Sequence, residues 1–165
     1  MRIIVLSDTH IPISSRDLPP EVYAQARAAD MIIHAGDITE PEFLNRLKKI
    51  AKTVAVCGNM DSPDLRKTLR SKEVVRAGSV RIGIIHGHGA PSSLEELVLR
   101  EFKNVDVIVF GHSHIPLNKS RDGVLLFNPG SPTDKIFATQ NSFGILSVSG
   151  TTAHGEIIRI ERGEQ

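Results

Sequence analysis

The sequence predicts an α/β fold whose first part is a parallel β-sheet and whose later part adds antiparallel hairpins. Three short apolar runs, at residues 3–6, 31–34 and 53–57, alternate with segments of helical pattern. This β-α-β-α-β order, with crossovers long enough for a helix, indicates parallel strands joined by right-handed connections. Further along, pairs of strand-like segments flank glycine-containing turns, which is typical of hairpins.

The first strand is followed directly by two polar residues of interest. Residues 3–6 are an unbroken apolar run, which suits a strand buried on both faces, and Asp8 and His10 come just after it. In open α/β sheets, ligands bind beyond the carboxyl ends of the strands. Asp and His are both good ligands for divalent metals. Taken alone, the pair also fits a helix cap or a turn.

The next two strands end in the same way. Three prolines predict a loop at residues 11–20, and a helix follows through residue 28. The strand at 31–34 ends at Gly36 and Asp37. A helix beginning near residue 39 is expected to bury one face, made of Phe43, Leu44, Leu47 and Ile50.

The third strand and the first hairpin continue the pattern. The strand at 53–57 ends at Asn59, and a short helix is expected after Pro63. Residues 73–76 and 79–85 form a hairpin pattern around Ala77-Gly78, and its second strand ends at His86.

The last third contributes one more strand with polar residues at its end. After a helix from residue 91 to about 102, the strand at 105–110 ends at His112 and His114. Two more hairpins are predicted, with strands at 115–119 and 123–127 and at 142–149 and 152–160, followed by a solvated tail at 161–165. The loop at 128–132 is expected beside the histidine turn.

Seven potential ligands therefore follow apolar strands: Asp8, His10, Asp37, Asn59, His86, His112 and His114. Singly, each has an ordinary explanation as a loop, cap, turn or surface residue. Those explanations do not account for oxygen and nitrogen ligands that converge on one sheet edge. Seven exceed the needs of one tetrahedral zinc and suit two metals about 3.5–4 Å apart with a bridging carboxylate. Cys57, the single cysteine, is expected in the core.

These motifs resemble those of the calcineurin-like metallophosphoesterases. The resemblance rests on Asp8-x-His10, Gly36-Asp37, Gly58-Asn59, His86 and Gly111-His112-x-His114, in this order. The short chain without cap insertions is similar to the small YfcE-like phosphodiesterase branch. The resemblance implies a four-layer α-β-β-α sandwich of mixed sheets flanked by helices, formed as a single domain over residues 1–165.

The resemblance also implies roles for the seven residues. Asp8, His10 and His114 would hold one metal, Asn59, His86 and His112 the other, and Asp37 would bridge them. Asp37, Asn59, His86 and His112 would be the residues closest to catalysis, in which a metal-bridging hydroxide attacks phosphorus in line. The cofactors would be two divalent ions, foremost Mn²⁺, with Ni²⁺, Zn²⁺, Fe²⁺ and Mg²⁺ as alternatives.

One position departs from the family pattern. The larger family usually has Gly-Asn-His-Asp/Glu, whose histidine helps the leaving group depart; here Met60 stands at that position, followed by Asp61. Methionine cannot donate a proton. We therefore expect activity on phosphodiesters, including aryl and nucleotide types, over alkyl monoesters. His88 is a candidate for substrate contact, and His34 and His154 are expected to be structural or surface residues.

The composition of the chain disfavours some classes of binding partner. With 20 Lys plus Arg against 19 Asp plus Glu, no strong field attracts nucleic acid or a membrane surface. No apolar stretch approaches the roughly 20 residues that span a bilayer, and no signal peptide is recognised, so a cytoplasmic protein is expected. The expected partner is a small phosphodiester, without a stable nucleic-acid complex or membrane; a homo-oligomer is left open. The alternative is a catalytically weak scaffold that resembles the retromer subunit of this fold, in which the ligand set is typically degraded, notably at the position of His10.

Overall fold

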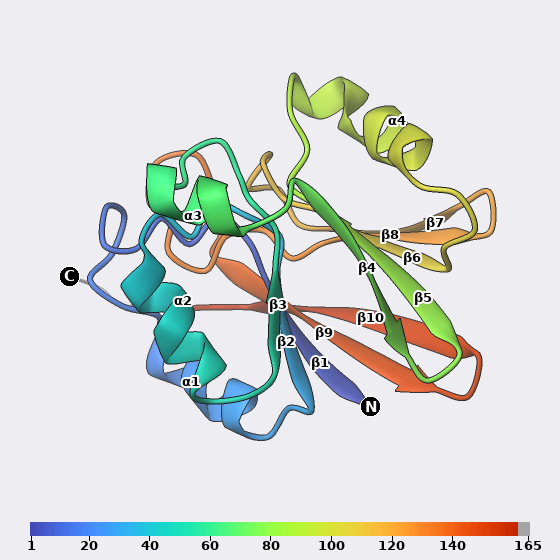
Figure 1. Cartoon of the computed structure of the whole chain (residues 1–165), viewed down its shortest axis with the longest axis horizontal. Helices are drawn as coiled ribbons and strands as arrows, with labels where there is room; N and C mark the ends of the chain where they lie inside the picture. The colour runs from blue at the N-terminus through green and yellow to red at the C-terminus, as the bar shows by residue number, and fades with distance from the viewer. Residues whose placement is uncertain (162–165) are drawn as a thin grey trace.

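Two five-stranded mixed sheets lie face to face in the computed structural model, which describes residues 1–161 (Figure 1). The first sheet has the order β10-β9-β1-β2-β3. Its strands are β1 (Arg2–Leu6), β2 (Met31–His34), β3 (Thr53–Ala55), β9 (Ser142–Ser149) and β10 (Thr152–Arg159). β1, β2 and β3 are parallel as predicted, and β9 joins the other side of β1 in an antiparallel register.

The second sheet has the order β4-β5-β6-β8-β7. It consists of β4 (Lys72–Ala77), β5 (Val80–Ile85), β6 (Val107–Val109), β7 (Leu117–Arg121) and β8 (Val124–Asn128). β6 pairs in parallel with both β5 and β8, whereas β4 and β7 are antiparallel edges. The carboxyl ends of β5 and β6 therefore lie at the same edge.

Four helices form the outer layers of the described chain: α1 (Pro20–Arg27), α2 (Pro41–Lys48), α3 (Pro63–Thr68) and α4 (Pro91–Glu101). Each begins with proline, whose fixed φ and missing N–H suit the first helical position. In Figure 1, α1, α2 and α3 lie on the side of the first sheet and α4 on that of the second. The four-layer α-β-β-α sandwich is confirmed.

Alternation along β1 explains how the layers are held together. Ile3 and Val5 pack into the core between the two sheets, whereas Ile4 and Leu6 pack with the helices of the first sheet. Successive strand residues point to opposite faces, so a strand covered on both sides must be apolar throughout. α4 covers the second sheet through a separate cluster that includes Leu94 and Val98.

Several strand boundaries differ from the prediction. β3 ends at Ala55 and β6 spans only Val107–Val109, because the chain leaves the sheet early to form the polar turns. The hairpin expected at 115–127 has its turn at Asp122-Gly123, where both residues have positive φ. Its first strand, β7, starts at Leu117 and not at residue 115. Of the tail predicted at 161–165, residues 162–165 lie outside the described residues. Within the described chain, no helix has the length and apolarity needed to cross a bilayer.

Candidate metal centre

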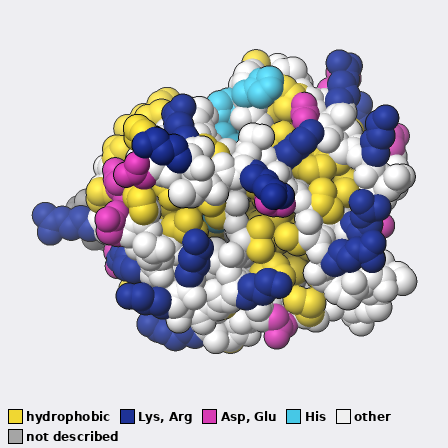
Figure 2. Space-filling view, viewed as in Figure 1, with side chains coloured by type: hydrophobic (Ala, Val, Ile, Leu, Met, Phe, Trp, Pro, Cys, Tyr) yellow, Lys and Arg dark blue, Asp and Glu magenta, His cyan; other side chains and the backbone are white. Residues whose placement is uncertain are grey.

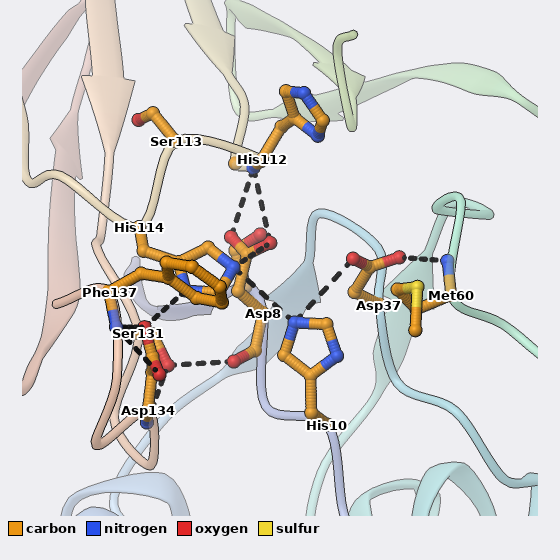
Figure 3. Close-up of polar contacts among 12 residues, drawn as sticks. Asp8, His10, Asp37, Met60, His112, Ser113, His114, Ser131, Asp134 and Phe137 are labelled. Atoms are coloured by element: carbon orange, nitrogen blue, oxygen red, sulfur yellow. Dashed lines mark hydrogen bonds and ion pairs between the residues drawn. The ribbon is translucent and has the colours of Figure 1, made fainter. Parts of the chain in front are cut away.

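The seven predicted ligands meet where the ends of the two sheets face each other. Four of them follow strands of the first sheet: Asp8 and His10 after β1, Asp37 after β2, and Asn59 after β3. The other three follow the second sheet: His86 after β5, and His112 and His114 after β6. The expectation of a single sheet edge was therefore wrong: the stacked sheets each supply part of the set (Figure 3).

The backbone turns sharply at these positions. Of the eight described non-glycine residues with positive φ, five belong to this set, namely Asp8, His10, Asp37, His112 and His114. Left-handed conformations are uncommon for residues with a side chain, and they cluster at functional sites. Neighbouring turns support one another, since the amide of Asp8 donates to Gly36 O (3.0 Å) and that of His10 to Asp37 O (3.0 Å).

Two glycines allow the turns to approach closely. A Cβ at Gly58 would lie 2.2 Å from Asp37 Oδ1, and one at Gly111 would lie 1.8 Å from Ser7 Oγ and 2.6 Å from Asp8 Oδ2. Any other residue would displace a carboxylate of the set. Glycine at these strand ends is therefore required for contact between loops.

The first group contains Asp8, His10 and His114. His114 Nε2 lies 3.3 Å from Asp8 Oδ1 and 3.4 Å from His10 Nε2 (Figure 3). One ligand atom from each residue falls within 4.8 Å of the others, so the group could hold a metal ion. These are the residues expected at the first metal.

The second group is centred on His86. Its Nε2 lies 3.1 Å from Asn59 Oδ1, 3.3 Å from Asp37 Oδ2 and 3.9 Å from Asp8 Oδ1. His112 Nδ1 lies 3.2 Å from the same Asn59 oxygen. One ligand atom each of Asp8, Asp37 and His86 also lies within 4.8 Å of the other two.

Asp37 lies between the two groups. Its Oδ2 is 3.6 Å from His10 Nε2 on one side and 3.3 Å from His86 Nε2 on the other. Its other oxygen accepts the backbone N–H of Met60 (2.7 Å), which fixes the orientation of the carboxylate. Asp8 also reaches both groups, a feature that the sequence did not suggest.

Three histidines are held so that one ring nitrogen faces the centre. His86 Nδ1 lies 2.8 Å from Ala35 O, His112 Nε2 lies 3.1 Å from Gly89 O, and His114 Nδ1 lies 2.5 Å from Asp134 Oδ2. Carbonyl and carboxylate oxygens only accept, so each of these nitrogens carries the hydrogen. In a neutral ring, the opposite nitrogen then presents its lone pair inward, as metal-binding histidines do.

The comparisons with known proteins agree with this geometry. Residues 1–151 match the calcineurin-like phosphoesterase superfamily domain. The chain belongs to this superfamily. It is 41% identical over 136 residues to a probable metallophosphoesterase of Methanocaldococcus jannaschii, covering 81% of this chain and 69% of the relative. It is 37% identical over 163 residues to a probable metallophosphoesterase of Methanothermobacter thermautotrophicus, covering 96% and 92%.

Solved structures of other proteins share the fold. Vacuolar protein sorting 29 from Cryptosporidium parvum superposes with a TM-score of 0.78 at 21% identity, covering 98% of both chains. A structure described as that of a novel archaeal phosphodiesterase gives a TM-score of 0.72 at 22% identity, covering 96% of this chain and all of the other (100%). At these identities the likeness concerns the fold alone.

The charges of the site fit a cation-binding role within the superfamily. Asp8 and Asp37 are buried. In the described chain, histidines are the only basic side chains within ion-pair distance of these two carboxylates. Buried carboxylates need a compensating positive charge. With imidazole, carboxylate and amide donors and no thiolate, the set suits borderline or hard divalent metals.

In the absence of metal, protons can supply that charge. Burial opposes protonation of His86, but the hydrogen bond to Asp37 and the charges of Asp8 and Asp37 raise its pKa to about 9. The pKa of His114 is likewise raised to about 9, against the effect of burial, by Asp8 and Asp134. Burial would raise the pKa of Asp37, but its bonds to His86 and Met60 lower it overall. Metal ions would replace these protons.

Asp134 is a residue of the site that sequence analysis missed. Besides His114, its carboxylate accepts the backbone N–H groups of Ile136 (2.8 Å), Phe137 (3.1 Å) and Ala138 (2.7 Å). Burial would raise its pKa, yet these donors lower it to about 2. Its only sequence cue was the preceding loop at 128–132, expected beside the histidine turn. That expectation is confirmed, because Asn128 Nδ2 donates to Gly111 O (2.9 Å).

The remaining candidates lie at the margin of the site or outside it. Met60 is 52% exposed and lines the cleft that opens above the ligands. Asp61 is buried and accepts the amides of Thr39 and Gly58, each at 2.7 Å, so it fastens two of the turns. His88 is exposed and does not line the cleft. His34 is buried beside Thr9, with Nε2 3.0 Å from Thr9 Oγ1, in agreement with a structural role.

Proposed function

We propose that this chain is a dinuclear-metal-dependent phosphodiesterase. The observation that carries the proposal is the set of three histidines, each held by an acceptor on one ring nitrogen. With the other nitrogen, His86 and His114 face carboxylates and His112 faces the side-chain oxygen of Asn59. Such preorganisation is typical of metal sites, in which outer partners orient the ligands.

Two metal sites follow from the two groups. Asp8, His10 and His114 would hold one ion, Asn59, His86 and His112 the other, and Asp37 would bridge them. Divalent ions there, most simply Mn²⁺, would supply a water of lowered pKa and neutralise charge on a phosphoryl group. The number and identity of the ions belong to the proposal.

The chain's own residues orient these ligands. The Met60 amide holds Asp37, the Ala35 carbonyl holds His86, and Asp134 holds His114. The site can therefore bind metal without rearranging its buried carboxylates.

The preference for diesters rests on Met60. Its side chain lies in the cleft, at the place where family members usually carry a proton-donating histidine. Without that donor, a leaving group must depart with its own charge, which favours aryl and other good leaving groups.

The proposal is tested in two steps. The protein is purified without added metal, and its metal content is measured by elemental analysis. Hydrolysis of matched aryl diesters and monoesters is then assayed with Mn²⁺. We expect bound divalent metal and faster hydrolysis of the diester. Absence of both metal and hydrolysis would refute it.

The alternative is a catalytically weak scaffold, which the similarity to vacuolar protein sorting 29 keeps in view. Two observations argue against it. The ligand set, including His10, is complete, and four of the seven exposed large apolar side chains of the described chain line the cleft rather than a separate face. On the face shown in Figure 2, Lys and Arg are scattered over several elements. A chain that lacked hydrolysis but captured a protein partner would support the scaffold.

A further inference from the structure

The cleft above the predicted metal ligands has an apolar wall. It has a volume of about 500 Å³ and is lined by four exposed apolar side chains: Ile13, Met60, Ile136 and Phe137. Their exposures are 71%, 52%, 81% and 74%. Burying such side chains against a ligand is favourable, and a concentration of them at one opening is typical of a binding site.

Phe137 is fixed next to a predicted metal ligand. Its ring lies edge to face with the His114 ring, with centroids 5.8 Å apart and planes at 84° (Figure 3). The Asp134 carboxylate accepts the Phe137 amide at 3.1 Å and the His114 ring nitrogen at 2.5 Å. The Asp134 carboxylate therefore holds both the backbone of Phe137 and the ring of His114, while the Phe137 side chain faces solvent.

The polar lining of the cleft narrows the class of ligand. No Lys or Arg is among the described residues that line it, so no permanently charged cationic side chain there would pair with a second phosphate group. Apart from the predicted metal ligands and Asp134, the polar side chains of the lining are Ser14 and Ser113. The cleft thus offers faces for an uncharged flat ring and few groups for its edge.

We propose that Phe137, with Ile136, Ile13 and Met60, binds a flat aromatic ester arm of a substrate that carries a single phosphate. This inference rests on the proposed phosphodiesterase function and names its substrate class. The shared chemistry is an aromatic face, supplied either by an aryl ring or by a nucleobase. Contact between two aromatic rings, together with the buried area, corresponds to roughly tenfold in affinity.

Calorimetric binding of two phosphonates to the Mn²⁺-loaded protein tests the inference. Methylphosphonate and phenylphosphonate share a headgroup and differ only in the arm. We expect the wild type to bind phenylphosphonate roughly tenfold more tightly, and Phe137→Ala to reduce this ratio to about twofold. Phe137→Leu, which keeps apolar volume without a flat face, should give an intermediate ratio. Val74→Ala is the matched control, because Val74 is exposed (44%) and lies outside the cleft.

The outcomes are separable. Adenosine 5′-monophosphate serves as a third probe: if its affinity falls in Phe137→Ala more than that of phenylphosphonate, the arm is a nucleobase, and if less, an aryl ring. Equal binding of the two phosphonates by the wild type, or an unchanged ratio in Phe137→Ala, would overturn the inference while leaving the metal site intact. Failure of both phosphonates to bind the Mn²⁺-loaded protein would likewise overturn the inference, whereas the proposed function fails only if bound metal and hydrolysis of an aryl diester are both absent.

Discussion

Replacement of Asp134 by asparagine tests whether the site depends on an anchored histidine. Asp134 Oδ2 accepts from His114 Nδ1 at 2.5 Å, and His114 Nε2 faces Asp8 Oδ1 at 3.3 Å. Removing the negative charge weakens the orientation and basicity of His114 without removing any ligand. Loss of such an outer partner costs about 10–100-fold in metal affinity, or roughly 1.4–2.8 kcal/mol.

The assay is a titration of metal-free protein with Mn²⁺, in which binding is measured by calorimetry. We expect Asp134→Asn to weaken one of two binding steps by the stated factor. Asp64→Asn is a matched control, because the Asp64 side chain is 78% exposed and pairs only with surface Lys67 in the described contacts at 3.5 Å.

A double-mutant cycle separates positioning from general loosening of the structure. Asp134 also holds three backbone amides, so the substitution could act through the 134–138 turn. If it acts through His114, Asp134→Asn should have almost no further effect on Mn²⁺ affinity in a His114→Ala background. Equal losses in both backgrounds would refute the reasoning.

Three further predictions follow from the site. Since the pKa values of His86 and His114 are about 9 in the folded chain against 6.5 unfolded, metal-free protein should lose stability as pH rises from 6.5 to 9, by up to about 3 kcal/mol for each histidine. Urea unfolding measures this; Mn²⁺ should abolish the trend, and a flat metal-free profile would contradict it. Met60→His should accelerate hydrolysis of poor leaving groups about tenfold or more, with little change for nitrophenyl esters; equal rates on every leaving group would count against the role assigned to this position. Gly58→Ala should lower Mn²⁺ affinity by at least about tenfold, because its Cβ would meet Asp37 Oδ1 at 2.2 Å; wild-type affinity would show that the carboxylate can move freely.

Local pattern was enough to predict the seven candidate ligands that the fold brings together. Each of the seven residues follows a short apolar strand, and parallel strands bring their carboxyl ends to one side. The pairing of β1 with β9 could not be predicted in the same way. Ile3 is opposite Leu146, and no local signal specifies a contact over that separation. The stacking of the two sheets, and hence the site between their ends, depends on this long-range packing.

The residues that sequence analysis missed lie outside regular elements. Asp134 follows no apolar strand and stands 20 positions after the histidine that it orients. The exposure of the Ile136 and Phe137 side chains could not be predicted either, because an apolar pair in a sequence ordinarily indicates a place in the core. Their amides are held by local hydrogen bonds to Asp134, and the tertiary contact that ties this turn to the site is the one between Asp134 and His114. The residues at the strand ends could be predicted from the sequence, whereas the loop that completes the cleft could not.

The most direct test of the central claim is anomalous scattering at the manganese edge from crystals grown with Mn²⁺. We expect two peaks about 3.5–4 Å apart, one beside Asp8, His10 and His114 and the other beside Asn59, His86 and His112, with Asp37 between them. No peak at the junction of the two sheets, or one that contacts none of these side chains, would contradict it.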